Sequence, residues 1–205
     1  MRNRRPSMYV VASIIILSSL AWWAMFAHLE RVKPDERIQL FFSVHVNETD
    51  IQTDLLENFE DQNIQEISIH TISITNADYD AALLTQGMLL SDILILPTNF
   101  ITDQTIENFL ILDDAVLQQE GTNPSTYTFV SKNEKHYGLI VYDATSNINL
   151  LDNYINTSEF NSNSYCLLIN NNSPFIKEAK SDDDAISLLY SVIYNLINHN
   201  QNNID

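Results

Sequence analysis

Glycine is scarce in this chain of 205 residues, which contains only three: Gly87, Gly121 and Gly138. Phosphate-binding loops and dinucleotide-binding fingerprints need glycines a few residues apart, so neither can be built from these three. No serine stands in a GxSxG motif, and the scattered histidines show neither metal-ligand spacing nor an HExxH motif. The sequence gives no support to an enzyme, and we expect no catalytic residue, cofactor or metal.

Cysteine and arginine are also nearly absent from most of the chain. The single cysteine, Cys166, excludes an internal disulfide, and its apolar neighbours predict a small buried hydrophobic residue. No arginine follows Arg37, and the part of the chain after the first apolar segment carries seven basic and 27 acidic residues, a formal charge of −20. Such a surface repels nucleic acid and anionic lipid and lacks the guanidinium forks that grip phosphate, so we expect no nucleic-acid partner.

One long uncharged segment begins at Met8 and ends at Ala27. A helix of about 20 apolar residues spans roughly 30 Å, the thickness of a hydrocarbon core. Three arginines precede it (Arg2, Arg4, Arg5), which places the N-terminus in the cytoplasm and the remainder outside the cell membrane. A cleaved signal peptide is the alternative, but the run is long for one and ends without a small-x-small site. A buried core helix fits the length and the arginines less well.

The chain then divides into four expected parts. These are the cytoplasmic arginines with the transmembrane anchor (1–27), a short polar stalk (28–37), an extracellular domain (38–198) and a polar tail (199–205). An external domain without disulfides suits a bacterial surface.

The first half of the domain alternates between strand and helix patterns. Residues 37–46 and 64–74 show the period of two expected of strands, and 92–96 form a short apolar run. Between them, 51–62 and 76–88 have helical spacing, with Gly87 expected to end the second helix. The order β-α-β-α-β predicts an α/β fold with a doubly wound, mostly parallel sheet covered by helices on both faces.

The second half is predicted in less detail. Residues 127–131 and 136–143 form strands around a turn at 132–135, and 165–170 form another buried strand. A final helix follows Ser181, whose hydroxyl we expect to cap it in a box with Asp184.

These segments resemble one known family. RIQLFF, DLLENFEDQN, EISIHTISI and ADYDAALLTQGMLLSDILILP are similar, in this order, to the first lobe of bacterial extracellular solute-binding proteins of ABC importers, with the type 2 periplasmic-binding fold. The resemblance rests on a few weak motifs over residues 37–114 and is looser beyond: Phe59-Glu60, Tyr79, Leu83, Gly87, Asp92, Leu112-Asp113-Asp114, Lys135-His136-Tyr137-Gly138 and Leu168-Ile169-Asn170. It implies a shortened, membrane-anchored relative with one lobe.

In a doubly wound sheet, ligands bind beyond the carboxyl ends of the strands. Polar side chains that end the expected strands are the candidate ligand-binding residues: Ser43, His45, Asn47, Thr98, Asn99, Tyr142, Asp143 and Asn170. Ordinary turn and cap chemistry is the alternative for each of them.

Two functions remain open. The first is capture of a small polar solute, such as a sugar, for an ABC-transporter permease or a sensor. The second is a non-catalytic module that binds another protein of the cell envelope through the sheet or the final helix. The first predicts a concave polar cleft at the strand ends, and the second a filled strand end with an exposed apolar patch.

Overall fold

The computed structural model describes residues 13, 16–19, 22, 32–59, 64–119 and 123–198. The chain divides into two compact units, Met1–Lys33 and Pro34–Asp205. Most of the expected anchor and all of the expected tail lie outside the described residues. The described part of the chain contains no helix with the length and hydropathy needed to span a bilayer.

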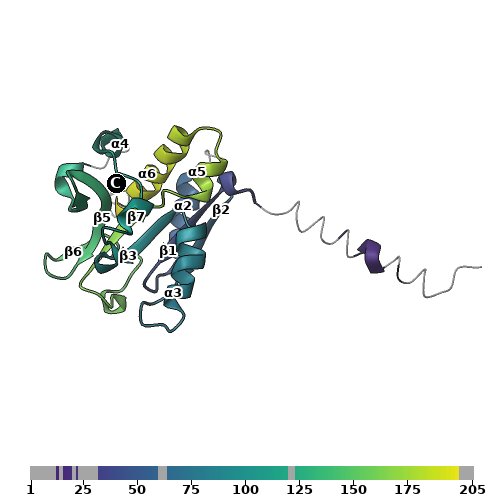
Figure 1. Ribbon diagram of the computed structural model, residues 1–205, viewed down its shortest axis with the longest axis horizontal. Helices are drawn as coiled ribbons and strands as arrows, with labels where there is room; N and C mark the ends of the chain where they lie inside the picture. The colour runs from purple at the N-terminus through teal and green to yellow at the C-terminus, as the bar shows by residue number, and fades with distance from the viewer. Residues whose placement is uncertain are drawn as a thin grey trace, which may run out of the picture. The chain divides into compact units, whose positions relative to one another are not determined.

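The Pro34–Asp205 unit is an α/β domain built on one mixed, seven-stranded sheet (Figure 1). Along the sheet the strands are β2 (Glu66–Thr71), β1 (Arg37–Phe42), β3 (Ile93–Pro97), β7 (Ser164–Ile169), β5 (Lys135–Asp143) and β4 (Phe129–Lys132). The short β6 (Ile148–Asn149) pairs with the end of β5.

The first three strands form the expected β-α-β-α-β unit. β1 lies between β2 and β3 and is parallel to both. Helix α2 (Glu48–Phe59) connects β1 to β2, and α3 (Tyr79–Ala82), continued by the π-helix η3 (Leu83–Met88), connects β2 to β3. Because crossovers are right-handed, and the connection from β1 to β2 runs along the sheet in the opposite direction to the connection from β2 to β3, these helices must cover opposite faces.

Alternating side chains give each face of the sheet its own core. Ile93 and Ile95 of β3 belong to a large cluster with α2 and the final helix, α6 (Asp182–Asn198). Leu94 and Leu96 face a smaller cluster that contains Tyr79 of α3. All four β3 side chains are at most 2% exposed, which confirms a strand buried on both faces.

The strands after β3 pair antiparallel. β7 is antiparallel to β3, and β5 is antiparallel to β7. β5 therefore runs in the same direction as β3, and their carboxyl ends share one edge, whereas β7 ends at the opposite edge. The hairpin of β4 and β5 turns at Asn133 and Glu134, which confirms the expected turn.

Three local features add to or depart from the expected pattern. Gly87 does not end its helix, which continues to residue 90; it is buried, and a Cβ there would lie 3.1 Å from Leu83 and 3.4 Å from Leu94 and Phe41. Two short helices, α4 (Asp114–Gln119) and α5 (Pro174–Glu178), complete the domain. The last residues of the expected stalk form η1 (Pro34–Glu36), which contacts α5 and so belongs to the domain.

Two sequence predictions about single residues are confirmed. Cys166 is fully buried, and burial raises the pKa of its thiol to about 12. The Ser181 hydroxyl accepts a hydrogen bond from the Asp184 N–H at 3.3 Å, as a helix cap does.

Candidate functional site

The topology places a switch point between β1 and β3. Their connections leave toward opposite faces of the sheet, so the carboxyl edge beside Ser43 and Thr98 is where this architecture usually holds a ligand. β5 adds Tyr142 and Asp143 to the same edge. The structure therefore brings Ser43, Thr98, Tyr142 and Asp143 to one edge.

Ser43 is fully buried and already has a partner. Its hydroxyl lies 2.6 Å from the Tyr79 hydroxyl, and the Tyr79 ring makes an edge-on contact with Phe100 at 5.5 Å. Burial raises the pKa of Tyr79 to about 12, so the phenol stays neutral at physiological pH and able to donate. Ser43 and Tyr79 therefore satisfy each other and present no free group to a solute.

A loop between β6 and β7, residues 150–163, covers this edge. The Tyr154 carbonyl accepts a hydrogen bond from the Asn47 N–H at 3.1 Å, and the Tyr154 hydroxyl donates to the Asp54 carboxylate at 3.0 Å. The Asn161 amide donates to the Ser73 hydroxyl at 3.1 Å. The loop is thus tied to α2 and to the segment after β2.

Thr98 and Tyr142 are engaged in the same closure. The Thr98 hydroxyl is hydrogen-bonded to the Ser164 hydroxyl at the start of β7. The Tyr142 ring stacks on Phe160 of the covering loop, with centroids 3.8 Å apart and planes 8° from parallel. The face of Tyr142 against Phe160 is therefore not available to a sugar ring.

Asp143 has the local role of a turn residue. Its carboxylate accepts hydrogen bonds from the Thr145 N–H at 2.8 Å and the Ser146 hydroxyl at 3.0 Å. Both hydrogen bonds lower the pKa of Asp143, and the bond from the Thr145 N–H has the larger effect. This is the Asx-turn chemistry that the sequence left open as the alternative.

The other four predicted residues do not form a site together. His45, Asn47 and Asn99 are exposed, and the Asn47 amide donates to Asp50 at the start of α2. Asn170 lies at the opposite edge because β7 is antiparallel, and its amide donates to the carbonyls of Met88 and Ser91. Sequence reasoning grouped Asn170 with the others because the sequence does not reveal strand direction.

Asp92 is the most strongly buried carboxylate of the described domain, and from the sequence we expected it only to mark the entry to the strand. At the amino end of β3 it accepts hydrogen bonds from the Gln39 N–H (2.7 Å), the Ser173 hydroxyl (2.6 Å) and the Phe175 N–H (3.1 Å). Burial raises its pKa from 3.8 to about 6, although these bonds and Arg37 oppose the shift. The carboxylate joins β1, β3 and the start of α5, and it is fully enclosed, so it acts as a structural clamp.

A serine and a histidine of the β4–β5 hairpin lie near an aspartate at the start of α4. The Ser131 hydroxyl lies 2.7 Å from His136 Nδ1, and His136 Nε2 lies 3.9 Å from an Asp114 oxygen. At 3.9 Å the carboxylate makes no hydrogen bond and cannot fix the histidine tautomer. The His136 ring also stacks on Phe129, with centroids 4.5 Å apart, so the group suits the hairpin surface better than nucleophilic catalysis.

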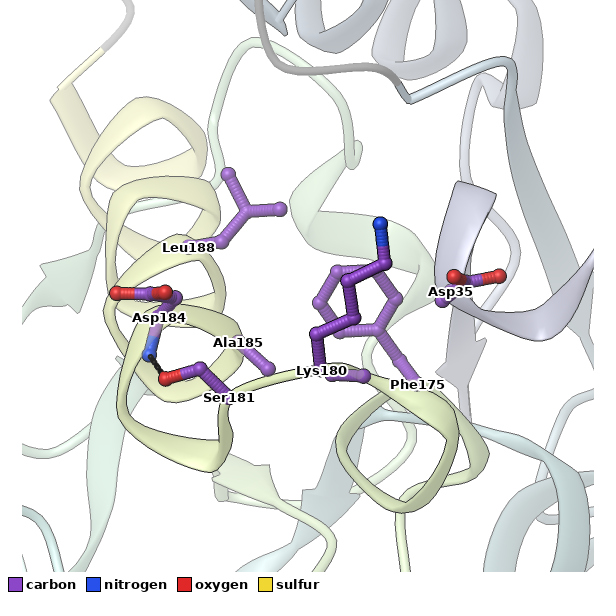
Figure 2. Close-up of a pocket in the computed structure, with 8 residues that line it drawn as sticks. Asp35, Phe175, Lys180, Ser181, Asp184, Ala185 and Leu188 are labelled. Atoms are coloured by element: carbon purple, nitrogen blue, oxygen red, sulfur yellow. Dashed lines mark hydrogen bonds between the residues drawn. The ribbon is translucent and has the colours of Figure 1, made fainter.

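Two of the hollows on the surface of the described domain are defined by their linings. The first, about 280 Å³, lies between η1, α5 and α6; Figure 2 shows Lys180 in front of Phe175, with Asp35 and Asp184 on either side. This volume is slightly below that of typical small-molecule pockets. The second, about 400 Å³, is lined by a single stretch of the chain, residues 149 and 152–157. No other element of the described domain contributes a polar group to its lining.

Among the described residues, no three His, Cys, Asp or Glu side chains are grouped as a metal site would require. No protein-family model, curated protein or solved structure matches the chain significantly.

Proposed function

We propose that the Pro34–Asp205 unit is a non-catalytic module that binds another protein, with the apolar segment before it as its membrane anchor. The closed carboxyl edge carries this proposal. Ser43 pairs with Tyr79, Thr98 with Ser164, and Asn161 with Ser73, so the polar groups that would grip a solute are bonded to one another. A solute would have to break these bonds and displace the loop at 150–163 before it gained any contact of its own.

An exposed apolar surface also supports the proposal. The final helix turns its apolar side to the large cluster, with Leu189, Val192 and Ile193 fully buried. Several large hydrophobic side chains are instead exposed around the helix before β3, where protein partners rather than solutes gain affinity.

Two measurements on the full-length protein test the proposal. The first is thermal unfolding in the presence of sugars and short peptides, in which we expect no solute to raise the Tm. The second is crosslinking in intact membranes, with a photoreactive residue placed at each of three exposed positions, 89, 145 and 178. We expect at least one position to give a single adduct that contains a second protein.

Opposite results would overturn the proposal. A saturable rise in Tm with one solute, lost in the Thr98→Val and Asn161→Ala variants, would identify the strand edge as a solute site. An absence of protein adducts from all three positions would remove the interaction role.

A further inference from the structure

Three leucines stand exposed within seven residues on the helix that leads into β3. Leu84 is 63% exposed, Leu89 67% and Leu90 45%; we call these three residues the leucine patch. Figure 1 shows this helix, labelled α3, on the near side of the sheet, and none of the other labelled helices is drawn over it. Single exposed leucines are ordinary, but clustered ones mark surfaces that are covered in the working assembly.

The π-helical turn creates the patch. In an α-helix, residues five apart point about 140° away from each other, whereas a π-helix bonds residue i to i+5 and places them one above the other. Leu83 and Met88, five apart, pack together on the smaller cluster. Leu84 and Leu89, also five apart, both point outward. The unusual turn thus separates four apolar side chains into an inner pair and an outer pair.

The inner side of this helix is fixed against the sheet. Gly87 is buried, and a Cβ at that position would lie 3.1 Å from Leu83 and 3.4 Å from both Leu94 and Phe41. The helix cannot rotate to bury the leucine patch without pulling Gly87, Leu83 and Met88 away from the smaller cluster on which they pack. The patch is therefore held outward by the packing of the domain and needs a covering group from outside it.

The charge around the patch indicates what this group is. The chain after the first apolar segment carries seven basic and 27 acidic residues, and the helix that bears the patch has no Lys, Arg or His. Asp80 is exposed one helical turn before Leu84. A second copy of the chain would bring the same negative charge to the contact and be repelled, whereas a basic partner would be attracted.

We propose that the leucine patch is the docking site of a protein segment that places apolar side chains on Leu84, Leu89 and Leu90 and surrounds them with Lys or Arg. The inference rests on the proposed interaction role and gives it a surface and a partner chemistry. The apolar contact supplies the affinity, and the basic residues supply the association rate and the selectivity.

Defined peptides test the partner chemistry directly. The probe is a fluorescent amphipathic helical peptide with leucines on one side and lysines on the other, titrated against the full-length protein. One control peptide carries glutamates instead of lysines, and another carries serines instead of leucines. We expect the leucine–lysine peptide to bind and the two controls to bind at least about tenfold more weakly, with affinity falling as salt is added.

Variants of the protein locate the binding. Leu84→Ser combined with Leu89→Ser should weaken the leucine–lysine peptide about tenfold or more, since both side chains are anchors. Gln86→Ser, an exposed change on the same helix, is the matched control and should leave binding unchanged. Because Leu84 and Leu89 are mostly exposed, the double variant should keep its Tm, which separates lost binding from lost folding.

Each contrary outcome overturns the inference. Equal binding to the double variant means that charge alone attracts the peptide, and equal binding of the glutamate peptide refutes the basic partner. If the wild-type protein binds none of the peptides, the proposed docking chemistry is refuted. If sedimentation shows a dimer of the wild-type protein that the double variant does not form, the occupant of the patch is a second copy of the chain. A membrane adduct from position 145 or 178 but not from 89 leaves the interaction role intact and removes the patch from it.

Discussion

Replacement of Asp92 by asparagine removes the one buried charge that ties β1, β3 and α5 together. The carboxylate is fully buried and accepts three hydrogen bonds, from Gln39, Ser173 and Phe175. An asparagine side chain has one acceptor oxygen and one NH₂ group. The NH₂ group can only donate, so it must face at least one of the three groups that now donate to the carboxylate. At least one of the three buried donors loses its bond, at a cost of about 1–3 kcal/mol.

The pH dependence of stability gives the sharper test. Burial raises the pKa of Asp92 from 3.8 to about 6, so between these values the folded protein keeps a proton that the unfolded chain has released. Proton uptake by the folded state makes the contribution of Asp92 to wild-type stability largest below pH 4, and this contribution is lost as the pH rises through 6. A shift of about two units corresponds to about 3 kcal/mol in total, of which about 1.4 kcal/mol is lost between pH 5 and 8.

The measurement is urea unfolding of the full-length protein and of Asp92→Asn at several values from pH 5 to 8. This range avoids the sequence pI of about 4.3, where solubility is lowest. Both tryptophans, Trp22 and Trp23, precede the domain, so circular dichroism rather than tryptophan fluorescence must report its unfolding. Subtraction of the two stability curves removes the contribution of the other acidic residues.

We expect the wild-type protein to lose about 1.4 kcal/mol relative to Asp92→Asn between pH 5 and 8. Asp183→Asn, a change of one exposed carboxylate, controls for the removal of a negative charge. A difference curve for Asp92→Asn that stays flat, or one that rises with pH, would refute the argument that burial dominates this carboxylate.

Two further predictions concern glycine and the positions that need it. Gly138→Ala should destabilise the domain by about 1–3 kcal/mol in urea unfolding, because its Cβ would lie 2.9 Å from a Leu168 methyl carbon and 3.2 Å from the Leu167 carbonyl oxygen. A loss below about 0.5 kcal/mol would show that β7 moves easily. Glu134→Gly should stabilise the domain by about 0.5–1 kcal/mol, because Glu134 has a φ of 63° in the β4–β5 turn. A Tm at or below that of the wild type would contradict this reading of the turn.

Much of the fold was predictable because it depends on local periodicity. The alternation of strand and helix over the first hundred residues gave the parallel β1, β2 and β3 unit and the two buried faces of β3. The hairpin turn followed from a polar break between two apolar strands. These features are set by residues close in sequence, so a pattern in the sequence is enough to reveal them.

Features that depend on contacts between distant residues were not predictable. Asp92 looked like the polar entry to a strand, but its partners Gln39 and Ser173 are 53 and 81 positions away. Gly87 looked like a helix end, because glycine often stops helices, whereas here it lies inside the helix and is buried beside Phe41 and Leu94. In both cases the residue type was informative, but the neighbour that explains it lies on another element.

The candidate site shows the same limit most clearly. Ser43 and Thr98 follow parallel strands at a switch point. The same sequence pattern is expected for an edge that binds a ligand and for an edge whose polar groups are hydrogen-bonded within the domain. The difference lies in whether another segment reaches them, and here Tyr79, Ser164 and the loop at 150–163 do. Closure of that edge leaves the outer side of the helix before β3 as the apolar surface without a partner in the domain. Polar residues that pair internally and leucines that cannot turn inward both favour recognition on a helix face over capture of a solute at the strand ends.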